Sequence, residues 1–280
     1  MGSLSNYSEN ALLGHLFTSA YTAPAGIYLA LLTADPSAGD GASITEAANA
    51  NNYARTAISF GAASARRVTQ DALLTFPAAS GTWGTITHWA LVDSATYGAG
   101  NVLAHGAFSS SFSPVAGNTP KVAAGQVYVE ITASSGAGFT TATANSLLDL
   151  MFNGTAFSSP AGNTYIALLN ATASDTTTLS TMTECSGTAY ARKEVHESGS
   201  ASSPKWEAVS GGATQNGAAI DFGTVGSGGW TQVVATAIVT AATGTSGLVL
   251  AFDNTNVVDQ TPAAGDTVQF ATGAFDVSLS

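Results

Sequence analysis

The sequence predicts a mainly β fold: two tandem copies of an antiparallel β-sandwich domain, each opened by a short amphipathic α-helix. One observation behind this prediction is an internal duplication, because residues 4–34 and 142–171 are two versions of one passage. Leu-Leu-Gly-His-Leu-Phe at 12–17 is repeated as Leu-Leu-Asp-Leu-Met-Phe at 147–152, and Tyr-Leu-Ala-Leu-Leu at 28–32 as Tyr-Ile-Ala-Leu-Leu at 165–169. The other is that short apolar runs are joined by turn-rich connections without intervening helical patterns, as in antiparallel sandwiches.

Further matches keep the same order along both halves. Tyr53-Ala54-Arg55 is matched by Tyr190-Ala191-Arg192, and Trp83 by Trp230, each tryptophan beside a glycine. Because the order is preserved, the chain is a tandem of two domains and not a solenoid of short repeats. The 280 residues leave about 140 for each copy, near the commonest domain size. We therefore expect an N-terminal repeat over residues 1–136 and a C-terminal repeat over residues 137–280.

A helix of three to four turns is expected near the start of each copy. In the first, Asn6 with Glu9 fits a capping box, and apolar residues then recur at helical spacing: Leu12, Leu13, Leu16, Phe17 and Ala20. The second copy repeats that spacing with Leu147, Leu148, Met151 and Phe152. Asn153-Gly154 should end the second helix, because a glycine there can adopt the left-handed conformation.

Apolar runs of strand length predict the rest of each copy. In the first copy they lie at residues 27–33, 53–60, 72–76, 85–93, 101–108 and 126–132, and in the second near residues 164–170, 189–195, 218–222, 231–239, 246–252 and 267–279. Residues 34–52, 172–188 and 198–217 contain few large apolar side chains and are expected to be long loops. Loops of that length in a compact domain are usually functional, and here they could reach neighbouring subunits.

The composition excludes several classes of protein. Charged residues make up 9% of the chain, against about 25% in an ordinary soluble domain, so the surface must consist of small neutral side chains, as in proteins packed into large assemblies. The net charge is −11 with seven Lys and Arg, which leaves no basic patch for nucleic acid. No apolar run is long enough to span a membrane. No signal peptide is recognisable at the N-terminus, so synthesis in a cytoplasm is expected.

Motifs for catalysis or for binding a cofactor or metal are not found. The chain has no HExxH pair, no Gly-x-Ser-x-Gly elbow, no phosphate-binding loop and no calcium loop. Its single cysteine, Cys185, excludes an intrachain disulfide and a cysteine-based zinc site. His15 is replaced by Leu150 in the second copy, which indicates a position that tolerates an apolar side chain. We expect no enzyme activity and no cofactor.

Six residues repeated in both copies are the interface candidates: Tyr53, Arg55, Trp83, Tyr190, Arg192 and Trp230. The tyrosine and arginine of each copy occupy alternate positions of an expected strand and so project from one face. In a chain this poor in cations, a repeated arginine should pair with a carboxylate or a run of carbonyls, fixing either a loop or a subunit contact. The tryptophans should anchor the core or an interface.

The first half also resembles a known family. The residues that carry the resemblance are Leu4-Ser5-Asn6-Tyr7, Glu9-Asn10-Ala11-Leu12-Leu13, His15-Leu16-Phe17, the run Tyr28-Leu29-Ala30-Leu31-Leu32-Thr33-Ala34-Asp35-Pro36, Tyr53-Ala54-Arg55, Phe76-Pro77 and Trp83-Gly84-Thr85-Ile86-Thr87-His88. They are similar to a family of structural proteins of tailed-bacteriophage virions, often labelled tail-fibre-like. The resemblance covers most of residues 4–132 and reaches the second half through the duplication.

The resemblance implies a non-enzymatic virion component that is made in the host bacterial cytoplasm and binds other virion proteins and copies of itself. The leading hypothesis is a decoration or cement protein on the outer surface of the capsid, bound to the major capsid protein. The alternative is a tail-associated or fibre-like protein that contacts the host surface. A third possibility is a carbohydrate-binding module in which Trp89, Trp206 or Trp230 stacks on sugars.

Overall fold

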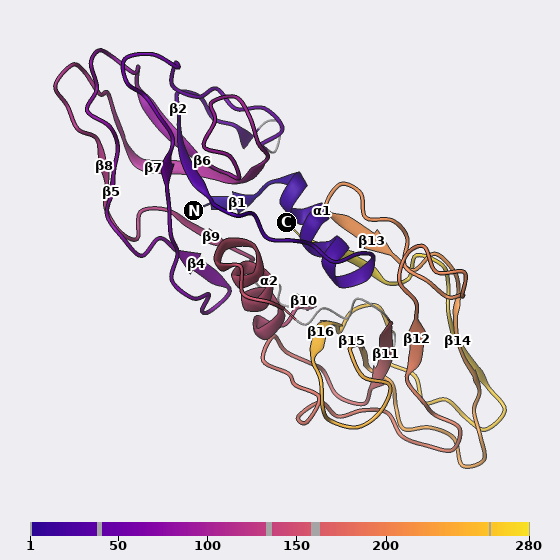
Figure 1. The fold of residues 1–280 in the computed structure, drawn as a ribbon. Coiled ribbons are helices and arrows are strands. Elements are labelled where there is room, and N and C mark those ends of the chain that lie inside the picture. Colours follow the sequence, from indigo (N-terminus) through magenta and orange to yellow (C-terminus); the bar gives the residue numbers. More distant parts are fainter. Residues whose placement is uncertain (1, 38–40, 133–135, 158–162, 258, 280) are drawn as a thin grey trace.

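The computed structural model describes residues 2–37, 41–132, 136–157, 163–257 and 259–279. The molecule is elongated, with a β-rich lobe at each end and both helices between the lobes (Figure 1). Both chain ends lie near this middle region, beside β1 and α1 (Figure 1). The mainly β, tandem architecture expected from the sequence is confirmed.

The first half is built on one large sheet. Its elements are β1 (Gly2–Leu4), α1 (Asn6–Phe17), β2 (Tyr28–Leu32), β3 (Thr56–Ala57), β4 (Arg67–Thr69), β5 (Leu74–Thr75), β6 (Ile86–Val92), β7 (Val102–Phe112), β8 (Lys121–Val122) and β9 (Tyr128–Glu130). Seven strands pair in the order β3-β2-β6-β7-β1-β9-β4, and β5 pairs with β8. The expectation of antiparallel pairing holds except between β1 and β9, which run parallel.

The second half repeats this plan with the sheet divided. Its elements are β10 (Ala137–Phe139), α2 (Thr141–Asn153), β11 (Thr164–Leu169), β12 (Lys193–Val195), β13 (Ala213–Gln215), β14 (Ile220–Thr224), β15 (Ala235–Val239), β16 (Val249–Asp253), β17 (Thr267–Phe270) and β18 (Asp276–Ser278). Five strands pair in the order β10-β16-β15-β11-β12, while β13 pairs with β18 and β14 with β17 in separate ribbons.

Strand register shows which positions of the two halves correspond. Tyr28 of β2 faces Val92 of β6, and Tyr165 of β11 faces Val239 of β15. The boundary predicted between residues 136 and 137 falls next to β10, with the adjoining residues 133–135 outside the described part of the chain. The two domain ranges therefore stay a prediction, consistent with this element order.

The helix ends differ in part from the prediction. Ser5, and not Asn6, caps α1, because the Ser5 side chain accepts a hydrogen bond from Ser8 N. Asn6 is already the first helical residue, so the capping box proposed for it is wrong. Thr140 caps α2 in the same way through Thr143 N. Gly154 ends α2 in the left-handed conformation with φ 62°, as expected.

Strands longer than four residues lie within the expected runs or extend them, and shorter strands were often missed. The segment 267–279, expected as one strand, forms β17 and β18 around a turn in which Gly273 has φ 74°. β13 lies inside residues 198–217, which were expected to be a loop. In the segment 53–60 only β3 is regular. Three-residue strands are too short to show alternation, and β1 and β10 precede the helices without an apolar run of their own.

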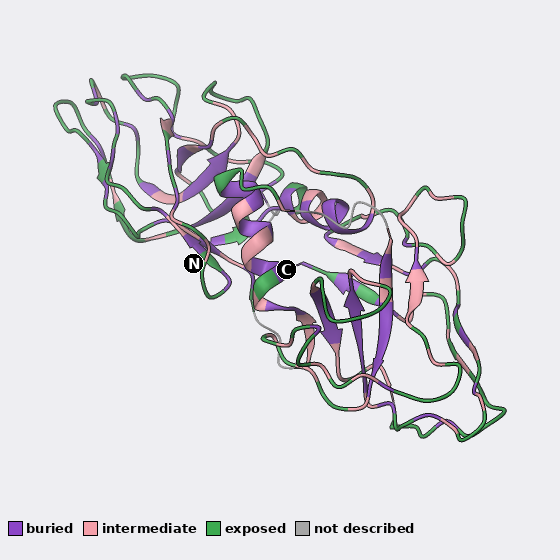
Figure 2. Ribbon diagram, turned by 60° about the horizontal axis from the view of Figure 1, so that its bottom comes forward, coloured by how far each residue is buried: buried purple, intermediate pink, exposed green. Residues whose placement is uncertain are grey.

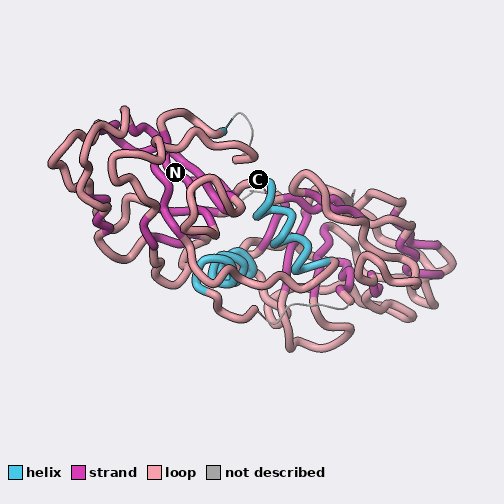
Figure 3. The backbone as a smooth tube through the Cα atoms, turned by 45° about the horizontal axis from the view of Figure 1, so that its top comes forward, coloured by secondary structure: helices cyan, strands magenta, loops and turns pink. Residues whose placement is uncertain are grey.

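Both helices pack across the junction between the halves. α1 contacts β7 of its own half and β13 of the other, and α2 contacts β16 of its own half and β4 of the other. Figure 3 shows the two helices together between the lobes. Aromatic contacts also join each helix to the opposite half. The ring centroids of Phe17 and Trp206 lie 4.6 Å apart, and those of Phe152 and Phe60 lie 5.3 Å apart. The two halves therefore share one continuous hydrophobic core.

An asparagine on each helix reinforces these contacts between the halves. Asn145 Oδ1 of α2 accepts from Arg66 N at 2.8 Å, and Asn10 Oδ1 of α1 accepts from Gly212 N at 2.9 Å. Arg66 (φ 68°) and Gly212 (φ 69°) occupy the same position in the tight turns that precede β4 and β13. Each helix thus satisfies a backbone donor of the opposite half, where an unpaired buried N–H would be costly.

Substituting either asparagine should weaken the contact between the halves. We expect Asn10→Ala and Asn145→Ala each to lower the free energy of unfolding by about 1–2 kcal/mol, the cost of a lost hydrogen bond and an unsatisfied donor. Urea denaturation measures the change. Asn118→Ala is the control, because its side chain accepts from Val115 N in an exposed turn away from the junction. A loss there equal to those at the junction would contradict the assignment.

Candidate functional site

A buried cluster holds the end of loop 34–52 against β2; we call Glu46, Tyr53 and Arg55 the N-terminal anchor. Tyr53 Oη donates to Glu46 Oε1 at 2.7 Å and accepts from Leu31 N at 3.0 Å. Arg55 makes a two-pronged contact with the Glu46 carboxylate, with Nε at 3.0 Å and Nη2 at 2.8 Å. The side chains of this ion pair are 2% and 3% exposed, so water screens their attraction little.

Arg55 also fixes a second loop. Its Nη1 donates to the carbonyl oxygens of Ser94 and Ala99, each at 2.8 Å. The guanidinium therefore joins loop 34–52 to the β6–β7 connection, as expected for an arginine paired with a carboxylate or with carbonyls. Burial, followed by the Glu46 charge, raises the pKa of Tyr53 far above its ordinary value, so this hydroxyl stays a hydrogen-bond donor to Glu46.

The second half contains the same cluster, the C-terminal anchor, formed by Glu184, Tyr190 and Arg192. Tyr190 Oη donates to Glu184 Oε1 at 2.8 Å and accepts from Leu168 N at 3.0 Å. Arg192 Nη2 lies 2.8 Å from Glu184 Oε2. The guanidinium also binds the carbonyls of Ala241 and Gly244, at 2.8 and 3.0 Å. Burial again comes first among the causes that raise the pKa of Tyr190.

Each anchor is covered by its tryptophan. Trp83 and Trp230 are 2% and 4% exposed, and their Nε1 atoms donate to the carbonyls of Asn51 and Thr188, each at 2.9 Å. Their rings meet Tyr53 and Tyr190 edge-on at 5.2 and 5.4 Å. All six sequence candidates thus lie in two equivalent clusters inside the chain, and contact with another subunit stays a prediction for them.

The glutamates at the centre of both anchors were missed by sequence reasoning. Neither Glu46 nor Glu184 is among the residues that the sequence comparison of the two copies matched. Glu46 precedes its arginine by nine residues and Glu184 by eight, so a shift of one residue hides the match. Their structural positions agree, since Glu46 bridges to Leu32 and Glu184 to Leu169 at the ends of β2 and β11. Allowing one deletion in the loop would have aligned them.

These clusters are suited to holding loops and not to reacting. The charges of each anchor are neutralised by its own ion pair and carbonyls. A pocket of ≈ 270 Å³ lies beside the N-terminal anchor, bordered by Tyr97, whose side chain is 39% exposed. In the described residues no group of three His, Cys, Asp or Glu side chains is placed to hold a metal ion. Burial raises the pKa of the Cys185 thiol, which lowers its reactivity.

The tryptophans proposed for sugar binding are also inside the chain. Trp89 and Trp206 are each 1% exposed, like the nearly buried Trp230. None of the three presents a ring face on which a sugar could stack, so the residues offered for a carbohydrate site were wrong. Within the described part of the chain, no helix is long and apolar enough to cross a membrane.

His15 packs at the junction in the position that Leu150 takes in the second copy. Its side chain is buried, its Nδ1 accepts from Tyr21 N at 2.9 Å, and its Nε2 lies 3.3 Å from Phe157 O. These bonds require a neutral ring with the proton on Nε2. Burial lowers the pKa of His15 below its ordinary value, consistent with a neutral ring.

This lowered pKa should make the protein less stable in mild acid. As the pH falls below about 6.5, the unfolded chain takes up a proton on His15 before the folded chain does, so the stability present at higher pH is progressively lost. His15→Leu should remove a pH slope of up to about 1.4 kcal/mol per pH unit. Urea denaturation of both proteins between pH 6.5 and pH 5 measures it, and equal slopes would refute the role of His15.

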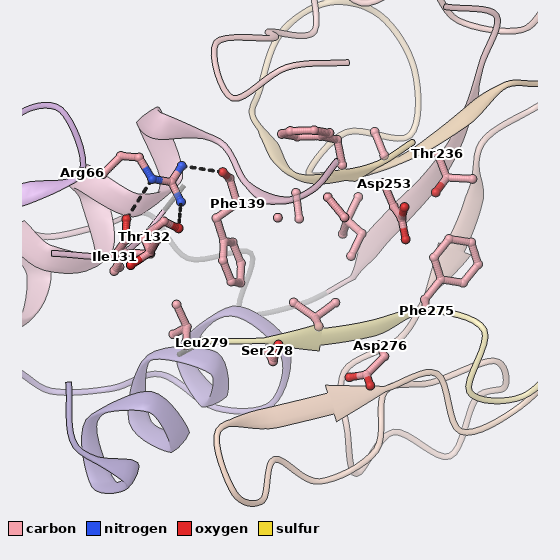
Figure 4. Close-up of a pocket in the computed structure, with 17 residues that line it drawn as sticks. Arg66, Ile131, Thr132, Phe139, Thr236, Asp253, Phe275, Asp276, Ser278 and Leu279 are labelled. Carbon is pink, nitrogen blue, oxygen red and sulfur yellow. Dashed lines mark hydrogen bonds between the residues drawn. The ribbon is translucent and has the colours of Figure 1, made fainter. Parts of the chain in front are cut away.

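Arg66 binds the segment that joins the two halves. Its Nε donates to Ile131 O at 2.9 Å, Nη2 to Thr132 O at 2.9 Å and Nη1 to Phe139 O at 2.7 Å (Figure 4). The residue is 6% exposed, and burial lowers the pKa of its guanidinium. Gly212 occupies the corresponding turn position in the second half. Sequence reasoning missed Arg66 because it has no counterpart in the duplication.

Comparison with known proteins gives one family. The family model described as "Podophage GP4 fiber I protein gp80" matches residues 3–130 and, separately, residues 138–278. The two matches correspond to the two halves of the structure, so the duplication read from the sequence is confirmed as two copies of one family unit. No curated protein matches the chain.

Proposed function

The chain belongs to the family of the podophage GP4 fiber I protein gp80, and from that membership we propose that it is a non-enzymatic building block of a phage tail fibre. Membership makes it a phage structural protein, a component of the virion. The finer assignment, to the fibre and not to the capsid surface, rests on the family description, which favours the tail-associated alternative over capsid decoration. The double family match is the observation that carries this proposal.

The shape of the molecule supports a role as a stiff connecting unit. The lobes extend in opposite directions from the shared core, and the parts farthest from the middle are largely exposed loops (Figure 2). Each helix packs against strands of both halves, and Arg66 binds carbonyls on both sides of the junction. These contacts resist bending at the junction. A fibre segment needs this combination of a rigid middle and accessible ends.

The anchors support a role of the two ends in binding other virion proteins. Each anchor fixes the end of a long loop by a buried ion pair and a second connection by carbonyl contacts, so that these segments are presented in defined conformations. A preformed loop binds with less loss of entropy than a free one. Because the loop sequences of the two halves differ, the two ends can bind different partners while the cores remain alike.

Electron microscopy of virions with and without this protein tests the assignment. We expect loss of the protein to remove fibre density and to reduce adsorption to the host, with DNA-filled heads of unchanged heat stability. Supplying the intact protein in trans should restore both. Loss of density from the capsid surface together with weaker heads would instead establish the decoration hypothesis, which the low surface charge and the two unlike loop sets also fit.

The absence of enzyme activity needs its own measurement. The purified protein should leave host surface polysaccharide intact, because the anchor carboxylates are each engaged by an arginine and a tyrosine. Polysaccharide cleavage that disappears on substitution of a single carboxylate would refute this part of the proposal.

A further inference from the structure

Strand pairing identifies one buried position at which the two halves carry very different side chains. Trp89 of β6 pairs with Leu31 of β2, and Thr236 of β15 pairs with Leu168 of β11. Leu31 and Leu168 correspond in the duplicated passage. The indole of the first half is thus replaced by a small side chain in the second.

In the first half the Trp89 indole fills the space between β6 and the strand β1. Trp89 is 1% exposed, and its ring lies so close to Gly2 that a Cβ at that glycine would come within 2.7 Å of Trp89 Cζ2. Gly106, the partner of both residues in the sheet, also lacks a side chain. A cavity of ≈ 30 Å³ lies beside Gly2.

In the second half the corresponding space is open. A cavity of ≈ 310 Å³ is lined by Thr236 and, in the place of Gly106, by Asp253 (Figure 4). Ala137, in the place of Gly2, also lines it. Phe139 and Phe275 form apolar walls. Its volume is at the lower end of the range of ligand pockets, and Thr236 Oγ1 is engaged by Asn256 at 3.1 Å.

The strands around this cavity are also less completely paired. β1 pairs with both β7 and β9, which makes the sheet of the first half continuous at this point. Among the described strands β10 pairs with β16 alone, and β18 pairs with β13. The cavity lies between β10 and β18, where the first half has a continuous sheet.

We propose that this cavity is a binding site for a planar aromatic group of about the size of indole that carries an N–H donor. The ring chemistry follows from the first half, in which an indole occupies the equivalent place. The N–H donor follows from a difference between the two sites in hydrogen-bond acceptors. In the first half Trp89 Nε1 has no hydrogen-bond partner in the described structure, whereas in the second half the Asp253 carboxylate could accept a hydrogen bond from the ligand. Its Oδ1 is held in position by Thr255 N and Asn256 N.

Binding of 5-fluoroindole to the full-length protein, followed by fluorine NMR, tests the proposal. A ligand this small should bind with a Kd of about 1 mM at one site per chain and raise the Tm by about 1–3 °C when present above its Kd. No binding at concentrations up to roughly ten times that Kd would overturn the proposal.

The decisive variant fills the cavity from within. Thr236→Trp combined with Ala137→Gly places a tryptophan near a glycine, as Trp89 lies near Gly2, where an added Cβ would meet the ring. This double variant should bind 5-fluoroindole at least tenfold more weakly, while Asn118→Ala, in an exposed turn of the first half, should bind as the unmodified protein does. Unchanged binding by a folded double variant would overturn the site.

A reciprocal variant keeps the test informative if the filled protein does not fold. Trp89→Thr should open a matching cavity in the first half, so that the number of 5-fluoroindole sites rises from one to two and added indole raises the Tm of this variant more than that of the unmodified protein. A Tm that does not respond to indole in either protein would count against the proposal.

The source of the aromatic group can be separated with a second probe. N-acetyl-tryptophanamide carries the same ring on a peptide backbone. If it competes with 5-fluoroindole, the site accepts a tryptophan side chain from a neighbouring virion protein; if only free indole binds, the site takes a small aromatic molecule. Competition by neither compound would overturn the assignment.

Discussion

Glu46→Ala is expected to lower the free energy of unfolding by about 3–5 kcal/mol, the usual cost of removing one partner of a buried ion pair. The substitution leaves the Arg55 guanidinium, whose side chain is 2% exposed, without its counter-charge. It also removes the acceptor for Tyr53 Oη. Both losses fall where little water can enter to replace the carboxylate. Urea or thermal denaturation of the full-length protein measures the effect.

The duplication supplies a matched control with the same bonds and different burial. Glu184→Ala removes the same contacts from Arg192 and Tyr190, but the Glu184 side chain is 23% exposed. Water can then solvate the remaining arginine, so the loss should be roughly half as large. Replacing both partners, as Glu46→Leu with Arg55→Met, should recover part of the loss. Equal losses in the two halves would mean that burial does not set the strength of the anchors.

The sequence was informative where a signal repeats over several residues. Helical spacing of large apolar residues located α1 and α2, and the runs around Leu31 and Leu168 located the central strands. The repeated tyrosine, arginine and tryptophan of each copy identified the anchors. The glutamates of the anchors were not identified, because loops tolerate changes of length. The spacing between glutamate and arginine differs by one residue between the copies.

Features that depend on how the halves meet could not be predicted. An amphipathic stripe shows that one face of a helix is buried, but not against which sheet. The contacts of α1 and α2 with the opposite halves could therefore not be predicted. Asn10 and Asn145 are ordinary polar residues until the opposite turn is placed next to them. Trp89 and Thr236 could be recognised as equivalent only from strand pairing, because each is matched through its partner in β2 or β11.

The two copies differ in the turns that precede β4 and β13. The turn before β4 carries Arg66, which binds the carbonyls of Ile131 at the end of one half and of Phe139 at the start of the next, while the turn before β13 carries Gly212. The contacts of Arg66 therefore lie at the junction of the halves.

Arg66→Ala should accordingly separate the stability of the halves as well as reduce it. The substitution leaves three carbonyl oxygens without their charged donor at a buried place, at an expected total cost of about 3–4 kcal/mol. Arg66→Lys should restore only part of this, because an ammonium cannot match the planar array of donors. Calorimetry should show one transition for the unmodified protein, whose halves share a core, and a broadened or divided transition for Arg66→Ala.

The neighbouring arginine is the control for this prediction. Arg67 pairs with Glu130 at 2.6 Å, yet its side chain is 45% exposed, and its guanidinium stacks on Tyr128 at 4.3 Å from the ring centre. Arg67→Ala should therefore cost less than about 1 kcal/mol and leave a single transition. If Arg66→Ala lowered the Tm without broadening the transition, Arg66 would be a buried contact of the first half alone, and the stiffness of the junction would have to come from the two helices.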